Sequence, residues 1–115
     1  MFVSRPIFTW RPRRTRRLIA KADRARDVAN YATAARLYRR ALAFDPRRTD
    51  IRVQLAHMLK ELTRFGEAEA AYRQALAQLP DDGDLHRQLG HLLKLLGRIK
   101  EAIAAYSAAH HLLPQ

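Results

Sequence analysis

Histidine is the residue type in this 115-residue chain best suited to metal binding or acid–base chemistry, and the chain has five. Two side chains on one helix can bind a metal together when they stand four residues apart, as His57 and Glu61 do. The sequence shows no further ligand for that pair. The other histidines are five residues apart or adjacent, so they do not share one helix face: His86, His91, His110 and His111. We therefore expect neither a metal site nor a cofactor.

Nucleophilic catalysis has no better support. The chain contains no cysteine, which excludes disulfides, zinc–thiolate sites and thiol chemistry. Ser4 and Ser107 are the only serines and neither lies in a catalytic motif, while the four glycines are scattered and form no phosphate-binding loop. The sequence thus predicts no catalytic residues, and we expect that the chain by itself is not an enzyme.

Positive charge is concentrated near the N-terminus. The net charge is +11, and residues 1–40 contain 12 basic residues against two acidic ones. The first 17 residues contain six arginines and no acid: Arg5, Arg11, Arg13, Arg14, Arg16 and Arg17. Phe2, Phe8 and Trp10 lie among them. A basic, aromatic head therefore precedes a body that is nearly neutral.

Three interpretations of this head remain open. It is a solvated leader, a strap whose aromatic side chains pack on the body or on a partner, or a tether. As a tether, residues 1–17 would bind a polyanion, either nucleic acid or an acidic membrane surface. Pro6 and Pro12 are expected to interrupt any helix in this segment. No apolar run suits a membrane span or a secretory signal, so we expect a cytoplasmic protein.

A period of 34 residues organises the body. Comparing residues 49–81 with 83–115 gives 16 identical positions of 33. Several residue types recur in all three units, with one bulky position beside them: Ala34, Ala68 and Ala102; Tyr38, Tyr72 and Tyr106; Ala41, Ala75 and Ala109; Pro46, Pro80 and Pro114; Tyr31, Phe65 and Ile99. We divide the chain into an extension, 1–14, and three units, 15–48, 49–82 and 83–115.

Each unit has the apolar spacing of two helices. The alanines let the two helices approach closely, and the tyrosines fill the remaining space. Thr49 and Asp50 are candidate N-caps in the second unit, as is the run Asp81–Asp84 in the third. Gly97 is a helix stop of the left-handed kind, and Asn30 is the candidate for that role in the first unit. Repeated helix pairs of this kind stack on one another, because no single pair can bury its apolar face.

The unit length and the order of alanine, tyrosine, alanine and proline resemble the tetratricopeptide repeat (TPR) family. The matching residues of the first unit are Tyr31, Ala34, Tyr38, Ala41 and Pro46. Those of the second are Leu55, Ala56, Leu59, Phe65, Ala68, Tyr72, Ala75 and Pro80. Those of the third are Leu89, Gly90, Leu93, Gly97, Ile99, Ala102, Tyr106, Ala109 and Pro114. Lys21, Arg52 and His86 depart from the family pattern. The repeats are also similar to TPR arrays of large bacterial proteins, including those attached to glycosyltransferases.

The resemblance implies an all-α, helix–turn–helix TPR solenoid in which three repeats form a short right-handed superhelix. It also implies a concave groove lined by the first helix of each unit. The polar groove positions are Arg16, Arg26, Gln54, His57, Lys60, Arg87, Gln88, His91 and Lys94. Ile19, Asp23, Val53 and Glu61 lie on the same face. The alternative is that these side chains form a solvated surface or help to stack the units.

These basic and amide side chains predict a peptide or protein partner with some acidic character. Asp23 occupies an asparagine position of the two-carboxylate clamp that co-chaperone TPR domains use, so a chaperone C-terminus is not the expected ligand. The main functional hypothesis is a protein-interaction adaptor. The alternatives are the non-catalytic TPR portion of a larger enzyme such as a glycosyltransferase, and the tether formed by residues 1–17.

The C-terminal end suggests a further contact. TPR arrays usually end in a helix with a polar outer face, which shields the last repeat. The sequence stops at Gln115, so Ile103, Leu112 and Leu113 are expected to be exposed. Self-association through this uncapped repeat is therefore one of the predicted interactions.

Overall fold

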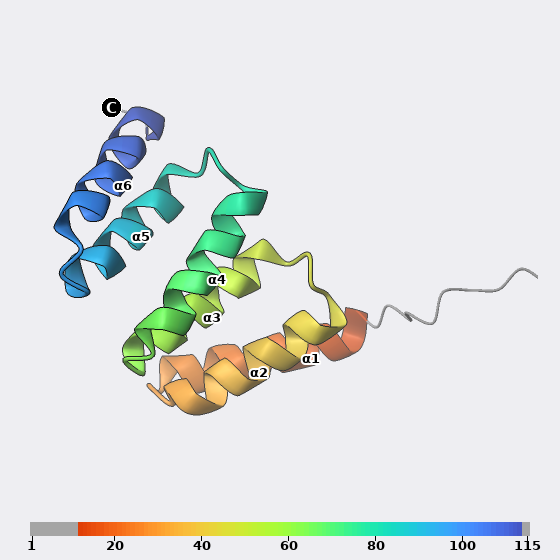
Figure 1. The fold of residues 1–115 in the computed structure, drawn as a ribbon. Helices are drawn as coiled ribbons and strands as arrows, with labels where there is room; N and C mark the ends of the chain where they lie inside the picture. Colours follow the sequence, from red (N-terminus) through yellow and green to blue (C-terminus); the bar gives the residue numbers. More distant parts are fainter. Residues whose placement is uncertain (1–11, 114–115) are drawn as a thin grey trace, which may run out of the picture.

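The structure, a computed structural model, describes residues 12–113. This part of the chain contains six α-helices and no strand: α1 (Pro12–Asp27), α2 (Tyr31–Phe44), α3 (Thr49–Glu61), α4 (Phe65–Gln78), α5 (Gly83–Leu95) and α6 (Ile99–Leu112). The helices form three consecutive pairs, with α1 and α2 at one end of the array and α5 and α6 at the other (Figure 1). The all-α repeat fold predicted from the 34-residue period is confirmed.

The core depends on the recurring alanines and tyrosines. Ala34, Ala68 and Ala102 are at most 2% exposed, which allows the helices of each pair to pack closely. Tyr38 and Tyr72 are fully buried and fill the space beside them. The three alanines share one position of the 34-residue repeat and the two tyrosines share another. The same side-chain packing therefore recurs from one repeat to the next.

The third pair packs more closely at one point. Gly90 stands where the second unit has Ala56, and a Cβ atom on Gly90 would lie 2.9 Å from Cε1 of Tyr106. That distance is shorter than a carbon–carbon contact allows, so glycine is required for the present position of the Tyr106 ring. The close approach has a cost, because glycine destabilises a helix by about 1 kcal/mol relative to alanine.

Two expected helix ends of the first repeat are wrong. Pro12 does not interrupt a helix but opens α1, where its missing N–H is not needed and its φ angle is already helical. The left-handed residue of the first unit is Ala29, with φ of 61°, and not Asn30. Asn30 is instead the N-cap of α2, and its side chain accepts a hydrogen bond from the N–H of Thr33.

The equivalent turns of the other units follow the same geometry. Thr63 has φ of 60° and Gly97, as expected, is left-handed with φ of 76°. Asp82 caps α5 as predicted, because its carboxylate accepts from the N–H of Leu85 at 3.1 Å. The caps expected at Thr49 and Asp50 are wrong, since α3 begins at Thr49 itself and its N-cap residue is Arg48.

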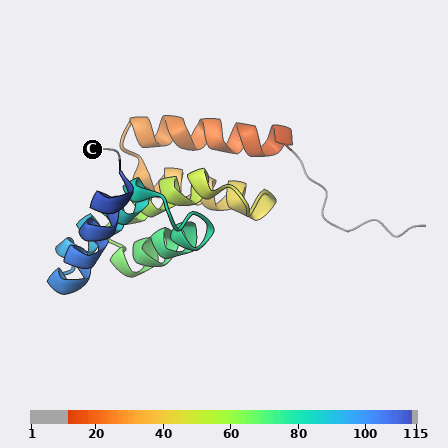
Figure 2. The same ribbon diagram turned by 90° about the horizontal axis from the view of Figure 1, so that it is seen from above.

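The pairs stack in sequence order. The second helix of one pair packs on the first helix of the next, so that α2 contacts α3 and α4 contacts α5. The described chain measures 57 × 37 × 26 Å. Figure 2 shows α1 along one edge of this array and α6 at the far end. Within residues 12–113, no further repeat packs on the outer surfaces of α1 and α6.

Candidate binding face

The first helices of the three pairs are linked by polar side chains. Nη1 of Arg26 on α1 donates to Oε1 of Gln54 on α3 at 3.1 Å. One repeat further, Nε2 of His57 on α3 is hydrogen-bonded to Oε1 of Gln88 on α5. The polar side chains of α1, α3 and α5 thus form one continuous surface, which we call the first-helix face. Four of the predicted groove residues meet on it directly.

A tyrosine from the second helix supports this face in the first and third units. The hydroxyl of Tyr38 donates to Oδ1 of Asp23 at 2.6 Å, and Nη1 of Arg26 donates to the same hydroxyl at 3.3 Å. In the third unit the hydroxyl of Tyr106 is 2.8 Å from Nδ1 of His91. Asp23 and His91 stand at equivalent positions of the period, so the same contact is made by different chemical groups.

The middle unit departs from this pattern. The rings of Tyr72 and His57 are 5.8 Å apart, but the Tyr72 hydroxyl is buried and has no hydrogen-bond partner among the described residues. Burial raises the pKa of Tyr72, because a phenolate would lose its hydration there, and the nearby carboxylates of Glu61 and Asp84 raise it further. The Tyr72 hydroxyl is therefore neutral and poorly satisfied.

Several predicted groove residues are already neutralised. Nη2 of Arg87 contacts Oδ1 of Asp84 in an ion pair, and Nε2 of Gln88 donates to Oδ2 of the same carboxylate at 2.5 Å. The side-chain hydrogen bond from Arg87 is the main cause that lowers the pKa of Asp84. Arg26 is paired with Asp23 at 3.4 Å and with Asp27 at 3.1 Å.

The lysines of this face are different. Within residues 12–113, the side chains of Lys60 and Lys94 make no hydrogen bond and no ion pair, and Lys94 is exposed while Lys60 is half-buried. They stand 34 residues apart, at the position that Arg26 occupies in the first unit. Arg16 is also exposed and unpaired within the described residues. These cations are the part of the face with unused binding capacity.

The N-terminal arginines are only partly described. Arg5 and Arg11 lie outside the described residues, as does the extension's aromatic segment. Arg13, Arg14, Arg16 and Arg17 are exposed on α1, so the predicted polyanion segment runs into a regular helix. Arg14 also lies over the ring of Phe44 at 5.2 Å, which holds its side chain against α2.

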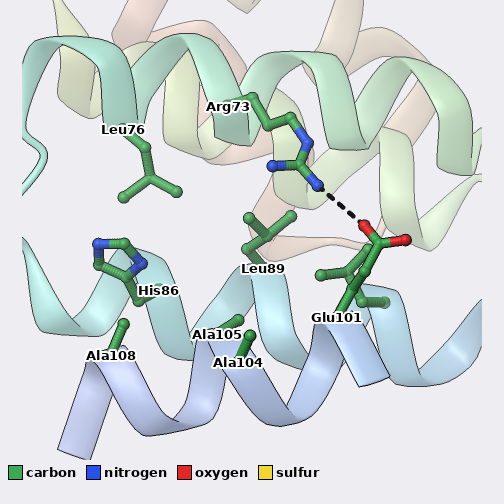
Figure 3. A pocket seen from close by; sticks show the side chains of 9 residues that line it. Arg73, Leu76, His86, Leu89, Glu101, Ala104, Ala105 and Ala108 are labelled. Carbon is green, nitrogen blue, oxygen red and sulfur yellow. Dashed lines mark ion pairs between the residues drawn. The ribbon is translucent and has the colours of Figure 1, made fainter. Parts of the chain in front are cut away.

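Sequence reasoning missed two features. The first is the contact of the tyrosine hydroxyls with the first-helix face. The spacing of the tyrosines predicts that their rings pack in the core, but it does not predict what their hydroxyls contact. The second is a cavity of about 330 Å³ between α4, α5 and α6 (Figure 3). Its lining is mainly apolar, with charged groups at the edge: Leu76, Leu89, Leu93, Ala104, Ala105 and Ala108, with Arg73, His86 and Glu101.

Comparing equivalent positions explains this cavity. In the preceding repeat Nη1 of Arg52 donates to Oε1 of Gln74 at 2.9 Å. The residues 34 positions later are His86 and Ala108, and these shorter side chains leave the space open. Figure 3 shows the ion pair of Arg73 and Glu101, 3.5 Å long, at one end of the cavity. In the sequence, the cavity is indicated by the replacement of Arg52 and Gln74 by His86 and Ala108 one repeat later.

Within residues 12–113, no helix is long and apolar enough to cross a membrane. No group of three or more His, Cys, Asp and Glu side chains in the same range is arranged to hold a metal ion.

Comparison with known proteins agrees with the repeat geometry. A family model described as tetratricopeptide repeat matches residues 59–115. The fold is similar to that of a mutant of MamA, with a TM-score of 0.82 and 25% identity, covering 88% of this chain and 74% of that chain. The chain covers 60% and 58% of the MamA chains of AMB-1 and MSR-1. A search of curated proteins gave no significant match.

Two more distant structures share the fold. The Arabidopsis OM64 TPR domain is 22% identical, with a TM-score of 0.82, covering 90% of this chain and 85% of that chain. The second TPR of Spaghetti (RPAP3), bound to the HSP90 peptide SRMEEVD, is 18% identical, with a TM-score of 0.79 and coverages of 87% and 93%. Residues 59–115 therefore match the tetratricopeptide repeat family, and the fold of the described chain is that of a tetratricopeptide repeat solenoid.

Proposed function

We propose that the chain is a non-catalytic protein-interaction module whose first-helix face binds an acidic peptide segment of a partner. The observation that carries this proposal is the pair of unpaired lysines, Lys60 and Lys94, at equivalent positions of neighbouring repeats. A carboxylate that meets an unpaired lysine gains a charge-assisted hydrogen bond without breaking an existing ion pair. The neighbour Spaghetti (RPAP3) TPR, whose peptide SRMEEVD is acidic, supports the suitability of the fold for such a ligand.

The charges of the face also limit where the ligand carboxylates lie. Asp23 and Asp84 are acidic and already accept hydrogen bonds from Tyr38, Arg87 and Gln88, so they repel a carboxylate nearby. The acidic residues of the ligand are therefore expected near the two lysines. Arg87 contributes less than Lys60 or Lys94, because its charge is compensated by Asp84.

A peptide selection with a charge reversal tests this proposal. Random peptides are selected against the full chain and against the Lys60→Glu, Lys94→Glu double variant. We expect Asp and Glu to be enriched with the natural chain, and Lys and Arg with the double variant. Arg17→Glu with Lys21→Glu on α1 is the matched control, and it should keep the acidic preference. An unchanged peptide composition with the Lys60, Lys94 double variant would refute the role of the face.

A second contact surface is favoured by one observation at the end of the array. Leu95, Ile99 and Ile103 are 62%, 53% and 59% exposed, and we call them the C-terminal face. The residues equivalent to Leu95 and Ile103 in the second repeat are Glu61 and Glu69, and Glu69 forms an ion pair with Arg98 of the next repeat. At these two positions the third repeat therefore has apolar side chains where the second repeat has carboxylates.

We propose that this C-terminal face pairs with the same face of a second copy. The outer surface of α1, at the other end of the array, carries exposed cations and is a poor match for isoleucine and leucine. Pairing the two apolar faces around a two-fold axis buries both and leaves the basic ends far apart. Leu112 and Leu113, also predicted to be exposed, are 39% and 36% exposed.

The larger-enzyme alternative and the cytoplasmic location both remain predictions. The alternative that these repeats belong to a larger enzyme, such as a glycosyltransferase, is tested by whether the reading frame continues past Gln115. The cytoplasmic location is tested by imaging the tagged chain in its source cell.

A further inference from the structure

The outer surface of α1 carries a straight row of unpaired cations. Arg13, Arg17, Lys21 and Arg24 are separated by four, four and three residues, so they lie on one side of the helix. All four are exposed, and none of their side chains makes an ion pair or hydrogen bond within residues 12–113. At 1.5 Å per residue the row, which we call the α1 stripe, is about 16 Å long.

The stripe differs from the arginines that form ion pairs with carboxylates. Elsewhere many arginines are partnered across and within repeats, as Arg39 is with Glu67 and Arg98 is with Glu69. The first turn of α1 has no acidic residue at all. Much of the excess positive charge of the protein is therefore gathered on one helix instead of being spread over the surface.

This gathering of charge destabilises the helix. Like charges four residues apart, such as Arg13 with Arg17 and Arg17 with Lys21, each cost about 0.2–0.5 kcal/mol. Arg13 and Arg14 also lie in the first turn, where the helix dipole disfavours positive charge. An anion that contacts several of these side chains at once removes the repulsion. Binding of such an anion must then stabilise the fold.

The apolar side of α1 is already occupied. Leu18 and Ala22 are buried against the rest of the repeat array, and Ile19 and Ala25 are partly buried against the same core. None of the exposed large hydrophobic residues of the described chain lies on α1. A helix that binds the membrane interface buries apolar side chains in it. The α1 stripe offers charge alone, which disfavours a lipid surface as its partner.

We propose that the α1 stripe binds the sugar–phosphate backbone of duplex nucleic acid without sequence preference. The backbone is itself a regular array of charge, with one phosphate of each strand for about every 3.4 Å of the helix axis. Arginine can bind phosphate with two parallel hydrogen bonds, and three of the four cations are arginines. Contacts to phosphates carry no base information, so the binding is independent of sequence. This site is separate from the first-helix face and does not depend on the proposed peptide ligand.

Salt dependence gives the proposal a quantitative form. Four phosphate contacts predict that log K falls against log salt concentration with a slope of roughly −3.6, at about 0.9 per contact. The probe is a fluorescent 20-base-pair DNA duplex, titrated with the full chain between 50 and 200 mM NaCl. The triple variant Arg17→Gln, Lys21→Gln, Arg24→Gln should lose at least about tenfold in affinity at 50 mM NaCl. Its slope should become shallower, at roughly −1, because one phosphate contact remains.

The matched control removes the same charge elsewhere. Arg36→Gln, Arg40→Gln, Lys100→Gln, at exposed positions on α2 and α6, leaves the α1 stripe and the first-helix face intact and should keep duplex affinity within about twofold. An equal loss in both triple variants would mean that net charge alone attracts the duplex, and the proposal would be wrong. A loss confined to an Arg5→Gln, Arg11→Gln variant would assign duplex binding to the extension and also overturn the proposal.

Two further measurements separate the remaining outcomes. The melting temperature should rise on adding duplex to the natural chain and stay constant for the stripe variant, whose own melting temperature should be no lower. That result excludes misfolding as the cause of lost binding. Vesicles containing phosphatidylserine provide the second probe. If the stripe variant loses vesicle binding while the duplex shows no stripe-dependent binding, the partner is a membrane surface and the nucleic-acid proposal fails.

Discussion

The hydroxyl of Tyr38 donates a hydrogen bond of 2.6 Å to Oδ1 of Asp23, which ties α2 to the first-helix face of the first repeat. The same position of the period holds Tyr72 in the second repeat, where the hydroxyl is buried and has no partner among the described residues. In the third repeat Tyr106 meets His91. One residue type thus has three different hydrogen-bonding situations in one fold, which makes the tyrosine hydroxyls a direct probe of the face.

Removing the hydroxyls should have opposite effects in the first two repeats. Tyr38→Phe takes a hydrogen-bond partner from Asp23 and Arg26 and should lower the free energy of unfolding by about 1–2 kcal/mol. Tyr72→Phe removes a buried, unsatisfied hydroxyl and should leave the stability unchanged or raise it by up to ~1 kcal/mol. Urea unfolding of both variants measures the difference. Equal losses in the two variants would contradict the contrast between the two sites.

The left-handed residues of the turns predict a second contrast. Ala29 and Thr63 have φ near 60°, a conformation that is strained for a side chain with a Cβ atom, whereas Gly97 adopts it freely. Ala29→Gly and Thr63→Gly should each raise the free energy of unfolding by roughly 0.5–1 kcal/mol. Gly97→Ala should lower it by about 1 kcal/mol. Thermal unfolding of the three variants checks the signs, and a loss in Ala29→Gly would count against the turn geometry.

An acidic junction joins the second and third repeats and predicts a pH dependence. Oε1 of Glu69 is 2.6 Å from Nη1 of Arg98, and Arg73 contacts the same carboxylate at 2.9 Å. The hydrogen bond from Arg98 is the main cause that holds the pKa of Glu69 below its ordinary value of 4.5. Its contribution to stability is therefore present above that ordinary value and is lost as the pH falls through the lowered pKa.

Glu69→Gln should remove part of that acid sensitivity. At pH 7 the variant should lose about 1 kcal/mol, a modest amount because the arginines are partly exposed to water. As the pH falls through the lowered pKa, the difference from the natural chain should shrink. The natural chain and the variant are compared by urea unfolding across a pH series that starts at neutral pH and ends in acid. A difference that grows in acid would have the wrong sign for this junction. Asp81→Asn, at an exposed carboxylate with no ion pair among the described residues, is the control and should leave the acid sensitivity unchanged.

Self-association through the C-terminal face is tested by molecular mass. Sedimentation equilibrium should show a concentration-dependent dimer for the natural chain. Ile103→Glu places a charge in the middle of the face and should shift the chain to the monomer. Ala70→Glu, an exposed position on α4, is the matched control and should keep the dimer. A monomer in the natural chain at all concentrations would remove this surface from the account.

The sequence predicted the repeating part of the fold well, because steric reasons recur with the period. Alanine at 34 and 68 and tyrosine at 38 and 72 are buried in the same way in each unit. The turns were less predictable, because Asn30 suits both a left-handed position and an N-cap, and the structure uses it as a cap. Pro12 was expected to interrupt a helix but begins α1, because a proline is tolerated in the first turn of a helix.

The first-helix face was predicted only in outline. Residue type and register indicated which side chains share it, but not that Arg87 is neutralised by Asp84 or that Gln88 links His57 to the same carboxylate. Such pairings depend on side-chain geometry across two helices. The cavity beside Ala108 was not predicted for a similar reason, because it arises from two shortened side chains, His86 and Ala108, that meet in space and not in sequence.

The measurement that tests the central claim most directly is amide chemical-shift mapping with an acidic peptide obtained from the selection. Binding at the first-helix face should shift the amides around Lys60, His57, Gln88 and Lys94 on α3 and α5, and the shifts should disappear in the Lys60→Glu, Lys94→Glu variant. Shifts confined to α4 and α6, around the cavity beside Ala108, would contradict the account and place the ligand at that cavity instead.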